Sequence, residues 1–191
     1  MQLLKYLVLA VAGLMLSPVL KAETDTLTTA FDGHWVINEE LSDDSDRQVE
    51  KAIKAGGGKV PRGKKTKGRY RGGPVEQQLY DHLSYDEELY FSYQEPEFVL
   101  RYSEGYERVF YSDGRSQVVS TSRRSKPLDF SFAGWEAGVL YVESKPLDAG
   151  YILEIFTLIN DASQLQVQLQ LEPASFLAPI RITRVYDRVL P

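Results

Sequence analysis

The sequence predicts an all-β domain in which an antiparallel meander of strands closes into a barrel or sandwich. From residue 89 onward, short runs of alternating apolar and polar residues are separated by turn residues at regular spacing. Asp113-Gly114 and residues 160–163 provide turn residues between neighbouring runs, which is typical of hairpins. In residues 165–171, Leu and Val alternate with Gln, so one face of this strand meets a core and the other meets water.

The first strand is expected over residues 31–38. With the period of two that strands impose, Phe31, Gly33 and Trp35 share one face while His34 lies on the other. A large buried aromatic beside a glycine marks a place where a neighbouring group approaches the backbone closely.

A short helix is expected over residues 43–55, after the first strand. Ser42 provides a candidate N-cap, and Val49 and Ile53 form a narrow apolar stripe four residues apart. Three consecutive glycines then end the helix. Residues 56–74 are rich in Gly, Lys, Arg and Pro and are expected to form a flexible basic loop.

A second short helix is an alternative for residues 75–84, where apolar residues repeat every four positions. From there to the C-terminus we count roughly nine strands. Their expected ranges are 89–93, 98–102, 106–111, 117–121, 128–132, 139–143, 151–158, 165–171 and 180–187.

The N-terminus has the pattern of a secretory signal peptide over residues 1–22. Lys5 precedes a short apolar run over residues 6–16, and Leu20-Lys21-Ala22 forms a plausible cleavage site. We therefore expect a single mature domain over residues 23–191, located in a bacterial periplasm or outside the cell, with no transmembrane segment after cleavage. The chain has no cysteine, which excludes disulfides, thiolate metal sites and thiol catalysis.

Charge is distributed unevenly along the chain. Although it carries 27 acidic and 22 basic residues in total, residues 51–72 contain nine Lys and Arg and no Asp or Glu. This segment is either a solvated tether or a site for an anionic partner, and export argues against nucleic acid as that partner. The candidate contacts are Lys59, Arg62, Lys64, Lys65, Lys67, Arg69 and Arg71.

The Gly33-His34-Trp35 triplet resembles the Gly-x-Trp signature that opens the barrel of lipocalins and related calycins. The resemblance implies a barrel with a basic residue from the last strand packed across the tryptophan, and Arg184 and Arg188 are the matching residues here. Residues 31–44, the basic stretch and the closing residues 185–188 are also similar to uncharacterised exported bacterial proteins. In this interpretation Gly33, Trp35, Arg184 and Arg188 are structural residues.

Aromatic residues are concentrated in the middle of the chain, where they either shape an amphipathic pocket or fill a plain core. The pocket candidates are Tyr90, Phe91, Phe98, Tyr102 and Phe110. No cofactor or metal is predicted, because the two histidines, His34 and His82, lack a ligand spacing. No catalytic residue is predicted, since the chain has no nucleophile motif and its acidic pairs are typical of solvated turns.

Three functions are compatible with these patterns. The first is an exported, non-enzymatic barrel that binds a small apolar or amphipathic ligand or a cell-envelope component. The second is an interaction protein in which the basic segment over residues 51–72 binds an anionic partner. The third is a hydrolase of the cell envelope.

Overall fold

The computed structural model of the chain describes residues 30–60, 83, 87–103, 105, 107–115, 117–119, 129–146, 150–173 and 177–190.

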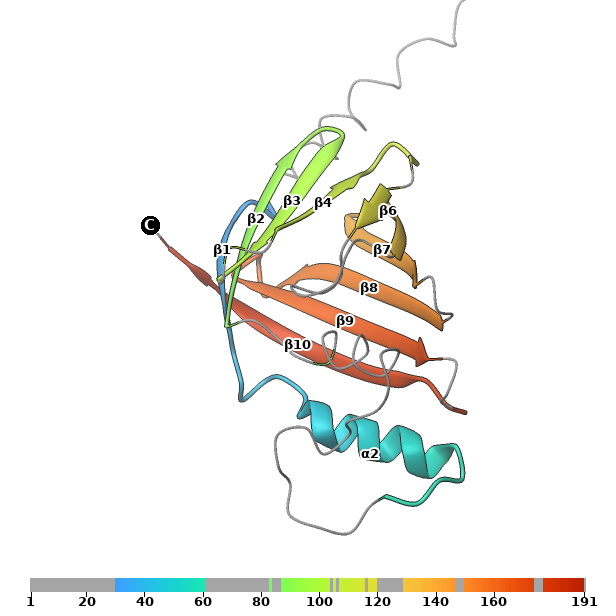
Figure 1. Cartoon of the computed structure of the whole chain (residues 1–191). Coiled ribbons are helices and arrows are strands. Elements are labelled where there is room, and N and C mark those ends of the chain that lie inside the picture. The colour runs from blue at the N-terminus through green and yellow to red at the C-terminus, as the bar shows by residue number, and fades with distance from the viewer. Residues whose placement is uncertain are drawn as a thin grey trace, which may run out of the picture.

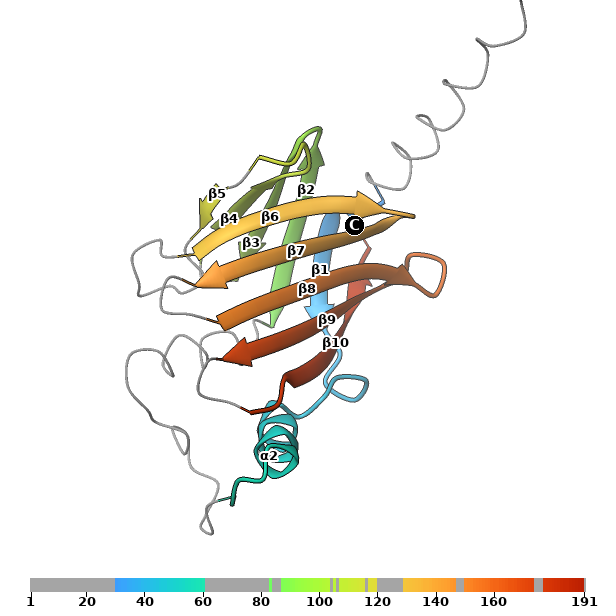
Figure 2. The ribbon, with the colours of Figure 1, turned by 90° about the vertical axis from the view of Figure 1, so that its right-hand side faces the viewer.

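Ten antiparallel strands of the described residues form one sheet, in the order β4-β3-β2-β1-β10-β9-β8-β7-β6-β5. The sheet curls strongly, so that β4 at one end of this order comes back to contact β5 and β6 at the other end (Figures 1 and 2). The result is a nearly closed barrel, and it confirms the predicted all-β meander. The strands are β1 (Gly33–Ile37), β2 (Glu88–Gln94), β3 (Glu97–Tyr102), β4 (Glu107–Tyr111), β5 (Gln117–Val119), β6 (Asp129–Glu136), β7 (Val139–Pro146), β8 (Gly150–Ile159), β9 (Gln164–Pro173) and β10 (Ile180–Val189).

The two predicted hairpins have different outcomes. Residues 160–163 connect β8 to β9, which pair along their whole length, so this hairpin is confirmed. The hairpin at Asp113-Gly114 is wrong, because the turn joins β4 to β5, the two ends of the strand order. A local sequence signal for a tight turn does not specify that the flanking strands pair, and here β4 pairs with β3 while β5 pairs with β6.

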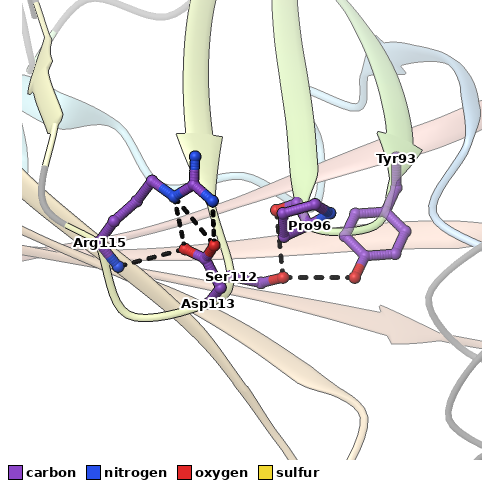
Figure 3. A network of polar contacts seen from close by, with 5 residues as sticks. All are labelled: Tyr93, Pro96, Ser112, Asp113 and Arg115. Atoms are coloured by element: carbon purple, nitrogen blue, oxygen red, sulfur yellow. Dashed lines mark hydrogen bonds and ion pairs between the residues drawn. The ribbon is translucent and has the colours of Figure 1, made fainter.

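The turn after β4 is held by its own side chains (Figure 3). The Arg115 guanidinium contacts both carboxylate oxygens of Asp113, with its Nε 2.9 Å from each. These hydrogen bonds hold the pKa of the Asp113 carboxyl below its ordinary value. On the other side, Ser112 Oγ lies 3.3 Å from the Tyr93 hydroxyl and donates to the Pro96 carbonyl oxygen at 3.2 Å. The end of β4 is thereby anchored to the β2–β3 hairpin.

The predicted helix after β1 is present as α2 (Ser45–Ala55), but its N-cap is Asp44 rather than Ser42. Asp44 Oδ1 accepts the Arg47 backbone N–H at 2.9 Å. Ser42 has a different role because the chain continues beside β10 after β1: its hydroxyl donates to Asn38 O at 2.6 Å and accepts the Val185 N–H at 3.0 Å.

The inward-facing side chains form two apolar clusters. The first, which we call the Trp35 cluster, contains Trp35 and the buried aromatics of β2, β3 and β4 together with apolar residues of β6–β10. The second, the α2 cluster, joins Val49 and Ala52 of α2 to the inward residues of β8, β9 and β10. The helix therefore packs against the barrel through one narrow face, and α2 lies beside β10 in both views (Figures 1 and 2).

Several predictions lie outside the described residues, namely the signal peptide over residues 1–22 and the basic loop from residue 61 to 74. Of the alternative second helix at residues 75–84, only Leu83 is described; it is helical and buried against α2. The single mature domain over residues 23–191 stays a prediction. Among the described residues, no helix combines the length and apolar composition needed to span a bilayer.

Candidate ligand-binding interior

Trp35 and Arg188 pack directly on each other. The two residues pair directly across β1 and β10, and Arg188 Cζ lies 4.0 Å from the centre of the Trp35 ring. Trp35 is fully buried, and its indole Nε1 donates to the Phe31 carbonyl oxygen at 3.1 Å. A guanidinium over an indole face gains cation–π attraction. Arg188 is thus the one of the two arginines suggested by the Gly-x-Trp resemblance that covers the tryptophan.

The guanidinium of Arg188 also joins separate segments of the chain. Its Nη1 donates to the Asp32 carbonyl oxygen at 2.8 Å, its Nη2 donates to the Ala30 carbonyl oxygen, and its Nε donates to the Ala162 carbonyl oxygen at 2.9 Å. Gly33 permits this arrangement, because a Cβ there would lie 2.9 Å from Arg188 Nη1. Gly33 also has a φ of +144°, a backbone conformation that residues other than glycine rarely adopt.

Three of the five pocket candidates lie together in the Trp35 cluster. Phe91, Phe98 and Phe110 are each at most 3% exposed. The Phe98 ring centre lies 6.1 Å from that of Phe91, 5.2 Å from that of Phe110 and 6.3 Å from that of Trp135. The rings pack on one another as an aromatic interior, at distances typical of attractive aromatic pairs.

Tyr90 does not belong to this interior. It is 39% exposed and stacks on His34 outside the barrel, with ring centres 4.3 Å apart, while its hydroxyl donates to Glu88 Oε2 at 2.9 Å. The physical reason is the period of two in β2: because Leu89 and Phe91 point inward, Tyr90 between them must point outward. The assignment of Tyr90 to an interior pocket is therefore wrong.

The fifth candidate, Tyr102, faces inward and belongs to a buried polar group that the sequence reasoning missed. Arg108 of β4 and Glu154 of β8, which are 4% and 7% exposed, form an ion pair with two parallel hydrogen bonds. Arg108 Nη1 donates to Glu154 Oε1 at 2.9 Å, and Nη2 donates to Oε2 at 2.6 Å. Arg108 Nη1 also donates to the Tyr102 hydroxyl oxygen at 3.1 Å.

Burial and the neighbouring charges shift the pKa values of Arg108 and Tyr102. Burial opposes the charge on Arg108, but attraction and hydrogen bonding from Glu154 and Tyr102 outweigh it and raise the pKa of Arg108 above its ordinary value. Burial raises the pKa of the Tyr102 phenol, which therefore stays neutral. Arg108 is on β4 and Glu154 is on β8, and these strands are not neighbours in the sheet, so the ion pair joins two inner faces of the barrel that do not pair through their backbones.

Other inward polar side chains lie next to this ion pair in the strand pattern. Ser131 of β6 and Ser144 of β7 are buried, and their hydroxyls lie 2.7 Å apart. Arg184 of β10 is 8% exposed, and its Nη2 donates to the Leu83 carbonyl oxygen at 2.9 Å. On each of these strands, a residue two positions from the polar one belongs to the Trp35 cluster, so the polar side chains adjoin that cluster on the same inner face. We call this set the polar belt: Tyr102, Arg108, Ser131, Ser144, Glu154 and Arg184.

A signal for the polar belt was present in the sequence. Glu154 lies between Ile152 and Phe156, and Arg108 stands two residues before Phe110, so alternation alone places both charges on the inner face. A charge on the buried face of a strand is uncommon and requires a partner. The identity of the partner was not deducible, because the two strands do not pair with each other.

The remaining candidate residues lie outside the barrel interior. Lys59 is exposed beyond the end of α2, and the other basic candidates fall outside the described residues: Arg62, Lys64, Lys65, Lys67, Arg69 and Arg71. His34 Nε2 lies 3.1 Å from Glu88 Oε2, and His82 is not described. Within the described ranges, no group of three or more His, Asp or Glu side chains is placed to hold a metal ion.

No family model and no curated protein matches the chain, so its likeness to exported bacterial proteins receives no support. Solved structures do match. Apo lipid binding protein 8 of Caenorhabditis elegans is 12% identical, with a TM-score of 0.50 over 84% of this chain and 96% of that chain. Fatty acid-binding protein from Drosophila melanogaster brain is 12% identical, with a TM-score of 0.47 over 82% of this chain and 98% of that chain. A luciferase domain of the dinoflagellate Lingulodinium polyedrum is 8% identical, with a TM-score of 0.47 over 84% of this chain and 43% of that chain.

The structure is a nearly closed antiparallel β-barrel, and its fold is similar to that of the C. elegans lipid binding protein. The strand topology and the first of these likenesses confirm the fold that the Gly-x-Trp triplet predicted.

Proposed function

We propose that this protein is a non-enzymatic carrier that holds a small amphipathic molecule inside its barrel. The observation that carries the proposal is the composition of the interior, where the polar belt adjoins apolar side chains of the Trp35 cluster and the α2 cluster. An apolar lining with a few convergent polar groups is the usual composition of a small-molecule site. The fold supports this, since barrels of this size enclose single small ligands.

Binding fits the interior better than catalysis does. Glu154 is the buried carboxylate of the polar belt, and both of its oxygens accept hydrogen bonds from Arg108. A general acid or base must present a carboxyl oxygen to the reacting group, whereas both oxygens of Glu154 are already held by the Arg108 guanidinium. The interior therefore lends no support to the third function, a hydrolase of the cell envelope.

A dye-binding experiment tests the proposal. N-phenyl-1-naphthylamine is uncharged and becomes fluorescent in apolar surroundings; we expect one molecule to bind per chain and to accept excitation energy from the buried Trp35. Ala133→Phe fills the interior, because Ala133 is 7% exposed and belongs to the Trp35 cluster, and we expect it to weaken dye binding at least tenfold. Phe132→Ala is the matched control on the same strand, since Phe132 points outward and is 43% exposed.

Two outcomes would overturn the proposal. The first is the absence of saturable dye binding to the wild-type chain. The second is loss of binding in Phe132→Ala with retention in Ala133→Phe, which would place the dye on the outer wall. Circular dichroism verifies that Ala133→Phe is folded, because overpacking a core costs about 1–3 kcal/mol.

The site of action that we propose is outside the cytoplasm, in a bacterial periplasm or the medium. The support is the pattern of residues 1–22, with a basic start, a short apolar run and a plausible cleavage site after Ala22. N-terminal sequencing of the protein recovered from the periplasm of an expressing bacterium tests it. A mature chain starting at Glu23 is expected, and an intact chain retained in the cytoplasm would contradict export.

A second role is proposed for the basic segment over residues 51–72, as a contact for an anionic partner such as an envelope component. Its support is that Lys51 and Lys54 of α2 and Lys59, which follows the helix, are all exposed. Vesicles containing an anionic lipid test it: replacing the nine basic residues with serine should abolish salt-sensitive cosedimentation. Unchanged cosedimentation would rule this role out.

A further inference from the structure

If the barrel is the carrier proposed above, the geometry of the polar belt determines which ligand head group its interior accepts. Each terminal nitrogen of Arg108 already donates to one oxygen of Glu154, at 2.9 and 2.6 Å. This fork-to-carboxylate arrangement is the one that an acidic ligand would form with an arginine. Glu154 therefore occupies, from within the chain, the position that a ligand carboxylate would take on Arg108.

An anionic ligand would have to displace Glu154 or lie beside it. Displacement leaves a buried carboxylate without its cation, and a buried charge that loses its partner is strongly destabilising. Lying beside it brings two like charges together in surroundings of low dielectric constant. Both arrangements disfavour a ligand that carries a negative charge.

Arg184, the other cation of the polar belt, does not offer an obvious alternative. Its Nη2 donates to the Leu83 carbonyl oxygen at 2.9 Å, and it has further interactions besides this one. The Leu83 carbonyl also accepts from the Ser45 hydroxyl at 2.9 Å, which ties this arginine to the start of α2. A ligand acid at Arg184 would compete with contacts that hold Leu83 in the α2 cluster.

Arg108 itself carries a donor that suits a neutral oxygen. Arg108 is 4% exposed, and within the described part of the chain its Nε is buried without a hydrogen-bond partner. A buried donor with no acceptor is costly, and a hydroxyl or carbonyl oxygen satisfies it without adding a charge. The Phe110 ring, whose centre lies 4.7 Å from Arg108 Cζ, provides an apolar surface next to this donor.

We infer that Glu154 is a specificity-determining residue, which neutralises Arg108 and makes the barrel select uncharged long-chain molecules with one oxygen head, such as an alcohol, aldehyde or ketone, over carboxylates. The head oxygen accepts the Arg108 Nε–H, and the chain lies against the Trp35 cluster.

Displacement of N-phenyl-1-naphthylamine by 1-dodecanol and by dodecanoate, at a pH where the acid is ionised, tests the inference. These competitors have the same chain length and differ in the head group. In the wild-type chain the alcohol should displace the dye at a concentration at least ten times lower than the acid. Equal or tighter competition by dodecanoate would overturn the inference and leave the carrier function standing, whereas no dye binding at all would overturn the carrier function itself.

Variants separate the role of Glu154 from general effects. Glu154→Gln leaves the charge of Arg108 free for a ligand acid, so dodecanoate should gain at least tenfold and the preference should reverse. Glu172→Gln is the matched control, because Glu172 is exposed on β9 and should leave both affinities unchanged. If Glu154→Gln does not fold, R108M/E154L removes both charges together with the Arg108 Nε donor, so 1-dodecanol should bind at least tenfold more weakly. An unchanged preference in folded Glu154→Gln, or an unchanged affinity for the alcohol in R108M/E154L, would overturn the inference.

Discussion

Replacing Arg188 with methionine tests how much its contacts with Trp35 and the main chain stabilise the barrel. The change keeps an apolar stem over Trp35 but removes three hydrogen bonds to main-chain carbonyls and the cation–π contact. A net hydrogen bond contributes about 1 kcal/mol, and a cation–π contact contributes about 0.5–2 kcal/mol. Because the guanidinium is only half-buried, water replaces part of the lost bonding. We therefore expect the free energy of unfolding to fall by about 3 kcal/mol.

Urea unfolding followed by tryptophan emission measures this change. The matched control is Arg181→Met on the same strand, because Arg181 is exposed and its Nε donates to Gln170 Oε1 at 2.9 Å. Surface substitutions of this kind usually change stability by no more than about 0.5 kcal/mol. If the two variants were equally stable, neither the hydrogen bonds of Arg188 nor its contact with Trp35 would stabilise the barrel.

Three further predictions concern the same interior and its rim. Gly33→Ala should lower the free energy of unfolding by about 1–3 kcal/mol, because the backbone is strained and the new Cβ crowds Arg188. In a double-mutant cycle, Arg188→Met should relieve part of this loss, and strictly additive losses would contradict the crowding. Glu154→Leu should lower the free energy of unfolding by about 3–5 kcal/mol, because it leaves the buried charge of Arg108 without a partner. R108M/E154L removes both charges and should unfold near the wild-type urea midpoint, and equal losses of stability in the two variants would argue against the ion pair. Burial raises the pKa of Asp32, so the native state retains a proton that the unfolded chain loses, and the contribution of Asp32 to stability falls as the pH rises through that window. Asp32→Asn should therefore gain stability relative to the wild type between acidic and neutral pH in thermal melts, and a constant difference across this range would refute the assignment.

Much of the fold was predictable because strands are read from local periodicity. The alternation in residues 165–171 and the turn at 160–163 correctly predicted β9 and its hairpin with β8. The same rule, applied strictly to β2, places Tyr90 outside, since Leu89 and Phe91 flank it. The error at Tyr90 therefore came from counting aromatics by region rather than by face.

The interior site was less predictable because its parts are distant in the chain. Arg108 and Glu154 are 46 residues apart, on strands that do not pair, and they meet only because the sheet curls until β4 returns toward β5 and β6. The turn at Asp113-Gly114 illustrates the same limit. A local turn signal cannot report that the strands on either side of it become the two ends of the sheet.

By itself, the sequence determined the type of each strand and the face that most side chains take, because the period of two is a property of the local backbone. The Gly-x-Trp resemblance named both Arg184 and Arg188 as candidates to cover the tryptophan without distinguishing between them. The register between β1 and β10, which pairs Trp35 with Arg188, decided which arginine covers the indole. Only the tertiary structure could decide this, since register and closure depend on strands brought together from opposite ends of the chain.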